Sequence, residues 1–241
     1  MKDIIEIYDN YNNIGVKNRT ITEGKEIELV REYINFRKSE FQPTENRKLA
    51  IFLEAKVDNA YPDIVFVEYS PENYINWNEA RAELNKDDLK ILYHIYITGG
   101  IDSTGLVKQL GVNWKEAMLA IEKLSDADLI IRNYKKWKIK DEKKLTTYTI
   151  EAVEAKLNNW DEVLQQSIIN KNFASESYAL SIMKSKPKEE TLKKFRKFGV
   201  GVYLKNENGF KRIKKARSVT MPVSFNSIFF NEWIGRIINL G

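Results

Sequence analysis

The fold is decided by the stretch TYTIEAVEAKLNNWDEVLQQSIINKNFASESYAL, residues 147–180. Its first residues, 147–153, are rich in β-branched and aromatic side chains, which predicts a strand. Asn158-Asn159 indicates a turn and a helix cap, and apolar residues at helical spacing predict a helix from Trp160 to Asn170. A second apolar run, 178–182, predicts another strand. A strand, a helix and a strand of these lengths are typical of a βαβ unit.

One charged pair lies where the first of these strands gives way to the helix. Glu154 and Lys156 are two residues apart, so both side chains are expected on the same face. The spacing alone indicates little, because the chain contains four Glu-x-Lys triplets, Glu23/Lys25, Glu54/Lys56, Glu142/Lys144 and Glu154/Lys156. Only the last has an apolar strand before it and a helix with Gln165 and Gln166 after it. This context makes Glu154 and Lys156 candidate site residues.

A second carboxylate is expected in KLAIFLEAKVDNAYPDIVFVEY, residues 48–69. Two apolar runs flank residues 58–61, which predicts a hairpin of strands at 48–57 and 62–69. Asp63 directly precedes the strongly apolar residues 64–67, and an acid at the start of a buried strand is costly unless it is paired or bound to a metal.

These motifs resemble a known enzyme family. Pro62-Asp63 at the start of one strand, Glu154-Ala155-Lys156 at the end of another and a following helix with Gln166 are similar to the PD-(D/E)xK nuclease superfamily. These restriction-endonuclease-like enzymes include Holliday-junction resolvases. The resemblance covers residues 20–69 and 145–205. It implies an α/β (α+β) fold with a mixed central sheet flanked by helices, and a Mg²⁺-dependent endonuclease that cleaves DNA, with Mn²⁺ as the alternative to Mg²⁺.

The chemistry of the candidate residues agrees with that resemblance. Asp63 and Glu154 offer hard oxygen ligands for one Mg²⁺, which polarises a phosphodiester and lowers the pKa of a bound water. Lys156 would orient the water or stabilise the charged phosphate. The resemblance adds two supporting residues, Gln166 and Glu26.

Three neighbouring residues are weaker candidates for the same site. Gln165 is the alternative to Gln166, and Glu23 is the alternative to Glu26 on a helix expected at about 22–38, with Thr22 as its cap. Glu54 precedes Asp63, the reverse of the family order, and is expected to belong to an exposed strand pair.

The chain between Asp63 and Glu154 has its own organisation. The two residues are about 90 positions apart, far more than a hairpin connection needs. The segment predicts three helices and two short strands around a basic turn, at 86–97, 104–110, 113–124 and about 129–140. This pattern resembles a winged helix-turn-helix domain. We therefore expect a nuclease-like domain of residues 1–69 plus 144–241, interrupted by a winged-helix insertion at 70–143.

Basic residues indicate a DNA-binding surface. In the insertion, the expected contacts are Lys115, Arg132, Lys135, Lys136 and Lys138. In the C-terminal third, they are Lys193, Lys194, Lys211, Arg212, Lys214 and Lys215. A solvated charged face is the alternative interpretation of these residues, and winged helices also serve as protein-docking or dimerisation modules.

Composition limits the function classes. The 241 residues carry a net charge of +5, which favours a polyanionic partner, and no cysteine, which excludes disulfides and thiolate metal sites. The single histidine, His94, lies in an apolar helix and is expected to be structural, which argues against a Ser–His hydrolase. No apolar run predicts a signal peptide or a membrane span, so we expect a cytoplasmic protein.

The sequence therefore predicts a Mg²⁺-dependent DNA-cleaving enzyme, as a homodimer or as a subunit of a larger complex. An amphipathic helix at 225–239 is expected to pack on the core or on a partner subunit. The first alternative is a non-catalytic DNA-binding regulator or adaptor with a nuclease-like core. The second is a protein-interaction module that docks through the winged helix.

Overall fold

A computed structural model describes residues 2–145, 147–182 and 187–240 of the chain. The chain forms two compact units. The first, the sheet unit, comprises Met1–Pro71 and Thr147–Asn226, and the second, the helical unit, comprises Glu72–Thr146 and Ser227–Gly241. The inner boundaries lie near those expected from the sequence. The C-terminal helix differs, because nearly all of it belongs with the helical unit rather than with the expected nuclease-like domain.

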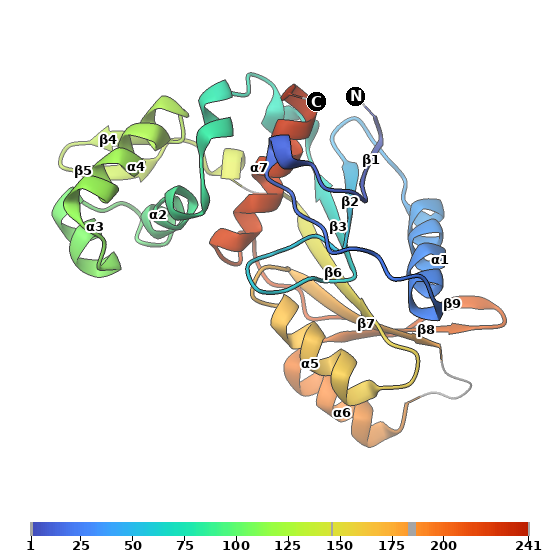
Figure 1. Cartoon of the computed structure of the whole chain (residues 1–241). Helices are drawn as coiled ribbons and strands as arrows, with labels where there is room; N and C mark the ends of the chain where they lie inside the picture. The colour runs from blue at the N-terminus through green and yellow to red at the C-terminus, as the bar shows by residue number, and fades with distance from the viewer. Residues whose placement is uncertain (1, 146, 183–186, 241) are drawn as a thin grey trace. The chain divides into compact units, whose positions relative to one another are not determined.

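The sheet unit contains a mixed seven-stranded sheet in the order β1-β2-β3-β6-β7-β8-β9 (Figure 1). The strands are β1 (Ile4–Ile7), β2 (Lys48–Leu53), β3 (Ile64–Tyr69), β6 (Thr149–Ala155), β7 (Glu176–Ile182), β8 (Gly201–Asn206) and β9 (Gly209–Lys214). β2, β3 and β6 form an antiparallel series, and β6, β7 and β8 run parallel. β1 pairs parallel to β2, and β9 pairs antiparallel to β8.

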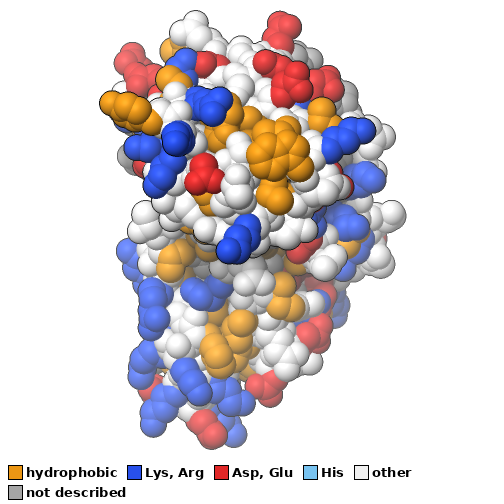
Figure 2. Space-filling model, turned by 90° about the vertical axis from the view of Figure 1, so that its left-hand side faces the viewer, with side chains coloured by type: hydrophobic (Ala, Val, Ile, Leu, Met, Phe, Trp, Pro, Cys, Tyr) orange, Lys and Arg blue, Asp and Glu red, His pale blue; other side chains and the backbone are white. Residues whose placement is uncertain are grey.

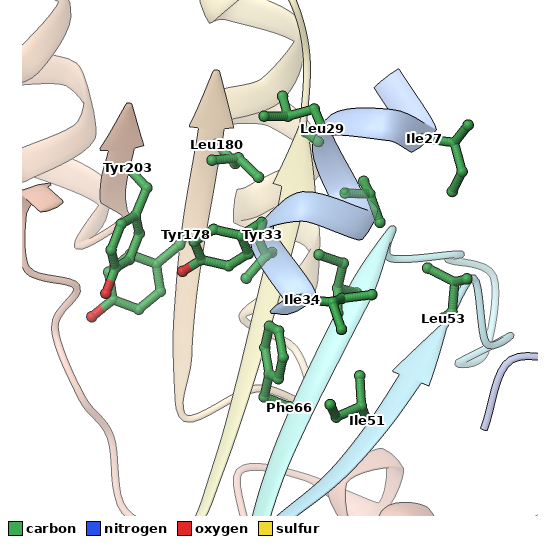
Figure 3. Close-up of a cluster of buried hydrophobic side chains, with 14 of the residues drawn as sticks. Ile27, Leu29, Tyr33, Ile34, Ile51, Leu53, Phe66, Tyr178, Leu180 and Tyr203 are labelled. Atoms are coloured by element: carbon green, nitrogen blue, oxygen red, sulfur yellow. The ribbon is translucent and has the colours of Figure 1, made fainter. Parts of the chain in front are cut away.

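Helices cover both faces of this sheet. α1 (Lys25–Glu40) packs on one face, where Tyr33 touches Phe66 and Tyr203 edge-on (Figure 3). α5 (Trp160–Asn170) and α6 (Glu189–Phe198) pack on the other face, against Ala179 and Val202. Because side chains alternate along a strand, Tyr178 and Leu180 of β7 face α1 while Ala179 faces α5 and α6.

One glycine permits the close approach of β7 and β8. Gly201 lies opposite Tyr178, and a Cβ atom on Gly201 would lie 2.2 Å from the tyrosine ring. Only a residue without a side chain leaves room for that ring, so the position requires glycine.

In the described part of the chain, the helical unit contains four helices, a two-stranded hairpin and short 3₁₀ turns. Its elements are η2 (Pro71–Tyr74, whose first residue belongs to the sheet unit), η3 (Glu79–Glu83), α2 (Lys86–Ile97), α3 (Ser103–Leu110), α4 (Trp114–Asp126), β4 (Ile130–Asn133), β5 (Lys136–Ile139), η4 (Glu142–Leu145) and α7 (Phe225–Leu240). Asn85, Asp102 and Asn113 cap α2, α3 and α4 with their side chains. A bridge between Ile101 and Trp137 ties the α2–α3 connection to the hairpin.

Helix α7 completes the core of the helical unit. Glu232 of α7 forms a buried ion pair with Arg81, whose Nε lies 3.1 Å from Oε2. Gly235 packs so closely on Trp77 that a Cβ atom there would lie 2.1 Å from the indole. These contacts explain why an amphipathic helix far along the chain belongs to this unit.

The predicted ends of helices were confirmed where the sequence contains a capping residue or a glycine. Helices 86–97 and 160–170 have the expected bounds, with Asn85 and Asn159 as caps. The expected cap Thr22 was wrong, because α1 begins at Lys25 after Gly24 and has no side-chain cap. His94 is half-buried, with Nε2 2.8 Å from Gln109 Oε1.

Among the described residues, no helix is long and apolar enough to cross a membrane.

Candidate active site

The register of β3 and β6 brings the two predicted metal-binding carboxylates together. The strands are adjacent and antiparallel with Ile64 opposite Val153, so the start of β3 lies beside the end of β6. The backbone N–H of Ala155 donates to Asp63 Oδ2 at 2.7 Å. Asp63 and Glu154 are both buried. The structure thus places the two carboxylates at one end of the sheet, in the arrangement expected from the sequence.

Burial gives these carboxylates a high proton affinity. It raises the pKa of Asp63 to about 6, although the N–H of Ala155 opposes this, and the charge of Glu54 adds to the increase. Burial also raises the pKa of Glu154 well above its usual range, and the charge of Asp63 is the second cause. When both groups are ionised they repel each other, and a cation between them would relieve that repulsion.

Helix α5 presents polar side chains to the same end of the sheet. Asn170 Nδ2 donates to Glu154 Oε1 at 2.6 Å. Gln166 lies one turn earlier on the same face of α5, and its Oε1 is buried without a hydrogen-bond partner among the described residues. Gln165, the alternative candidate, is exposed. Asn170 was missed by the sequence reasoning, although its spacing of four residues from Gln166 is a signal that could have identified it.

Lys156 follows the last residue of β6 and contacts helix α1. Its Nζ lies 3.1 Å from Glu26 Oε2 and 3.6 Å from Glu162 Oε1. Partial burial lowers the pKa of Lys156, but the hydrogen bond with Glu26 and the charge of Asp63 outweigh it, so the pKa is raised and the side chain is cationic. Glu23, the alternative to Glu26, pairs instead with Arg31 at 2.7 Å.

The strand alternation does not fix the direction of the Lys156 side chain. Glu154 accepts a hydrogen bond from Asn170 of α5, and Lys156 contacts Glu162 of α5 as well as Glu26 of α1. Because β6 ends at Ala155, Lys156 lies beyond the strand, and the expectation that Glu154 and Lys156 leave the same face stays a prediction.

Arg19 and Glu54 are further members of the cluster: Arg19 was missed by the sequence reasoning, and Glu54 was only a weak candidate. Arg19 Nη2 lies 2.7 Å from Glu54 Oε2, 2.9 Å from Oε1 and 3.8 Å from Asp63 Oδ1. Glu54 was expected in an exposed strand pair, but it is buried just after β2 with a left-handed φ of 52°. A bridge between Asn18 and Ala55 joins the two segments, and Glu54 N–H donates to the carbonyl of Asp63.

A pocket of about 310 Å³ opens beside these residues. Its lining includes the charged side chains of Arg19, Glu26, Glu54, Asp63 and Lys156. Two cations and three carboxylates in one pocket suit a ligand that carries negative charge and a metal ion together, such as a phosphate with Mg²⁺. Glu154 and Gln166 do not line this pocket.

The donor set fits a magnesium ion that has few protein ligands. In the described part of the chain, no group of three or more His, Asp or Glu side chains is arranged to hold a metal. Asp63 and Glu154 supply two neighbouring carboxylates, and Mg²⁺ characteristically binds through one or two carboxylates while keeping several waters. These two residues therefore fit Mg²⁺ as its protein ligands.

The predicted DNA-contacting residues lie on both units. In the helical unit, Lys115, Arg132, Lys135, Lys136 and Lys138 are all exposed. In the sheet unit, Lys193, Lys211 and Lys215 are exposed and Lys214 is half-buried. Lys194 pairs with Asp161 at 3.0 Å, and Arg212 is held by Tyr203 and Tyr178. Because Lys211, Arg212 and Lys214 lie on edge strand β9, protection of the sheet edge also accounts for their charges.

Comparison of the chain with models of protein families, with curated proteins and with solved structures finds no match.

Proposed function

We propose that this protein is a metal-dependent deoxyribonuclease of the PD-(D/E)xK type, which hydrolyses phosphodiester bonds in DNA. One observation carries the proposal: Asp63 and Glu154, each buried at the end of an apolar strand, lie on adjacent strands with Ala155 N–H bonded to Asp63 at 2.7 Å. Buried carboxylates with raised pKa values are costly to the fold and are typical of functional sites.

The order of elements supports a restriction-endonuclease-like core. A helix (α1), three antiparallel strands (β2, β3 and β6), a second helix (α5) and a parallel strand (β7) follow one another along the chain once the helical unit is set aside. In this interpretation, Asp63 opens the second core strand and Glu154-Ala155-Lys156 ends the third.

The residues of the site would divide the work of phosphodiester hydrolysis. Asp63 and Glu154 would hold Mg²⁺ or Mn²⁺, which when bound supplies charge stabilisation at the phosphate and a water of lowered pKa. Lys156 would donate hydrogen bonds to the phosphate or the attacking water, and Glu26 would keep its ammonium group in position. Asn170 would hold the Glu154 carboxylate, and the free Gln166 Oε1 would accept a hydrogen bond from a water in the site.

The helical unit would bind the DNA as a winged helix. Its helices α2, α3 and α4 and its hairpin β4–β5 follow the order of that motif. The hairpin would be the wing, and its exposed cations would contact phosphates.

A non-catalytic DNA-binding regulator or adaptor is the second candidate. The contact of Arg19 with Glu54 and its approach to Asp63 favour it, because a guanidinium already neutralises part of the acidic cluster. In such a protein the carboxylates would be structural.

Cleavage assays with matched lysine variants test the proposal. Wild type, Lys156→Ala and Lys56→Ala are incubated with supercoiled plasmid, linear duplex and single-stranded DNA, with Mg²⁺ or Mn²⁺ and with EDTA. Lys56 is the lysine of the Glu54-Ala55-Lys56 triplet in the β2–β3 hairpin, and it is exposed. It is therefore the matched control for Lys156 of the Glu154-Ala155-Lys156 triplet. We expect metal-dependent cleavage by wild type and Lys56→Ala, and a loss of at least 100-fold in Lys156→Ala.

Other outcomes would contradict the proposal in different ways. Cleavage that survives in Lys156→Ala would mean that the active site lies elsewhere. Absence of cleavage by wild type together with salt-sensitive DNA binding would favour the regulator.

A further inference from the structure

The tip of the β4–β5 hairpin presents an aromatic side chain to solvent. The strands pair with Asn133 opposite Lys136, which leaves Tyr134 and Lys135 as the two-residue turn. Tyr134 is 96% exposed, whereas Trp114 on α4 is 54% exposed. Packing within the protein therefore does not explain a tyrosine at this position.

The backbone does not favour a tyrosine there either. Tyr134 has a φ of 55°, in the left-handed region where a Cβ atom is unfavourable. Two-residue hairpin turns usually place Gly, Asn or Asp at such a position. A large aromatic ring at a strained and solvated turn suggests a role outside the folding of the hairpin.

All the charged residues of the hairpin around Tyr134 are cations. Residues 130–139 contain Arg132, Lys135, Lys136 and Lys138 and no acid, and all four cations are exposed. Arg132 lies over the ring of Trp137 at 5.5 Å from its centroid. On the face seen in Figure 2, Lys and Arg side chains lie next to exposed hydrophobic ones. An exposed ring among four cations matches a nucleic acid, whose bases stack on aromatic rings while its phosphates meet cations.

We propose that Tyr134 stacks on an unpaired nucleobase, and that the substrate of this protein is DNA with a single-stranded segment. In an intact duplex each base is covered by its neighbours, so a ring on a hairpin tip can stack only on an unpaired or terminal base. Arg132, Lys135 and Lys136 then contact the phosphates on either side of that base. This inference rests on the proposed function, because it assumes that the protein binds DNA.

Binding measurements without divalent metal test the inference separately from cleavage. The Kd values of the wild type are measured by fluorescence anisotropy, in EDTA, for three oligonucleotides of equal length: a blunt duplex, a duplex with a single-stranded tail and a single strand. The tail carries 2-aminopurine, whose fluorescence falls when it stacks. The variants are Tyr134→Ala, Tyr134→Phe and Lys135→Ala, with Tyr148→Ala as the control, because Tyr148 is also exposed but lies just before β6.

The inference predicts a pattern across these substrates. Wild type binds the tailed duplex and the single strand more tightly than the blunt duplex. Tyr134→Ala weakens binding to both by about 5- to 100-fold, the range of one stacked base, and abolishes the 2-aminopurine quenching. Tyr134→Phe retains both properties, and Tyr148→Ala behaves as wild type. Lys135→Ala weakens binding to all three substrates alike and reduces the salt dependence.

Two results would overturn the inference. If Tyr134→Ala binds all substrates as wild type does, or weakens all equally, Tyr134 does not read unpaired bases, while DNA binding and cleavage by wild type would leave the proposed nuclease intact. If wild type binds no DNA in EDTA even at low salt, the inference fails, and the cleavage assay with Mg²⁺ or Mn²⁺ decides separately whether the proposed nuclease stands. Because the side chain of Tyr134 is 96% exposed, the substitution should not disturb packing, and an unchanged melting temperature of Tyr134→Ala verifies that the variant folds.

Discussion

Asp63→Asn is expected to make the protein more stable at neutral pH. The pKa of Asp63 is about 6 in the folded protein against an ordinary value of 3.8. Between these pH values the unfolded chain loses a proton that the folded protein keeps, so the free energy of unfolding falls as pH rises through this window. Each pH unit corresponds to about 1.4 kcal/mol, so ionised Asp63 costs the fold about 3 kcal/mol above pH 6. Asparagine has no charge to bury and can still accept the hydrogen bond from Ala155 N–H.

The prediction is checked by calorimetric melting of wild type and Asp63→Asn from pH 4 to pH 8, without divalent metal. The variant should match wild type near pH 4 and melt higher above pH 6, by about 6–12 °C if the full 3 kcal/mol is recovered. Glu45→Gln, which neutralises an exposed acid, is the control and should show no such divergence. Equal melting temperatures across the range, or a less stable Asp63→Asn at pH 7.5, would refute the argument that burial destabilises this carboxylate.

A metal titration separates the stability argument from the proposed function. A ligand that binds only the folded state raises the melting temperature with its concentration. Mg²⁺ is therefore expected to stabilise wild type at pH 7.5 and to have little effect on Asp63→Asn. Equal stabilisation of both proteins would remove Asp63 from the metal site.

Three further predictions concern other parts of the structure. Arg81→Ala leaves the carboxylate of Glu232 buried without its cation and should destabilise the helical unit by about 3–5 kcal/mol, measured by urea unfolding. Gly201→Ala places a methyl group 2.2 Å from a tyrosine ring in β7 and should cost about 1–3 kcal/mol or more, measured in the same way. Arg19→Ala removes the guanidinium that lies 2.7 Å from Glu54 and should lower the Kd for Mn²⁺ measured by calorimetric titration, because the metal no longer competes with it; an unchanged Kd would place Arg19 outside the metal site.

The sequence predicted the elements that carry their own local signals. Helices α2 and α5 were located because Asn85 and Asn159 are caps followed by apolar residues at helical spacing. Strand β9 was not recognised as a strand of the sheet, because it lies at an edge and its residues were interpreted only as a basic run. Edge strands bury less surface, so their sequences carry a weaker pattern.

The candidate site was predictable in part for a similar reason. Asp63 and Glu154 each stand next to a strongly apolar strand, and that contrast marks them in the sequence. Arg19 and Glu54 lie together because Asn18 pairs with Ala55 in an isolated bridge. Neither segment has a hydrophobic periodicity from which this pairing could be predicted. Helix α7 is amphipathic, but its pattern does not predict whether it packs in the sheet unit or in the helical unit.

The division of the helical unit into two stretches of chain has a consequence for how the protein is made. Glu72–Thr146 leaves the ribosome before all of Thr147–Asn226, and α7 is synthesised only afterwards. Until then Arg81 lacks its buried partner Glu232, and the face of Trp77 on which Gly235 packs is uncovered. The sheet unit therefore has all its strands before the helical unit has its last helix, so the sheet unit can complete its fold first while the helical unit must wait for its C-terminal segment.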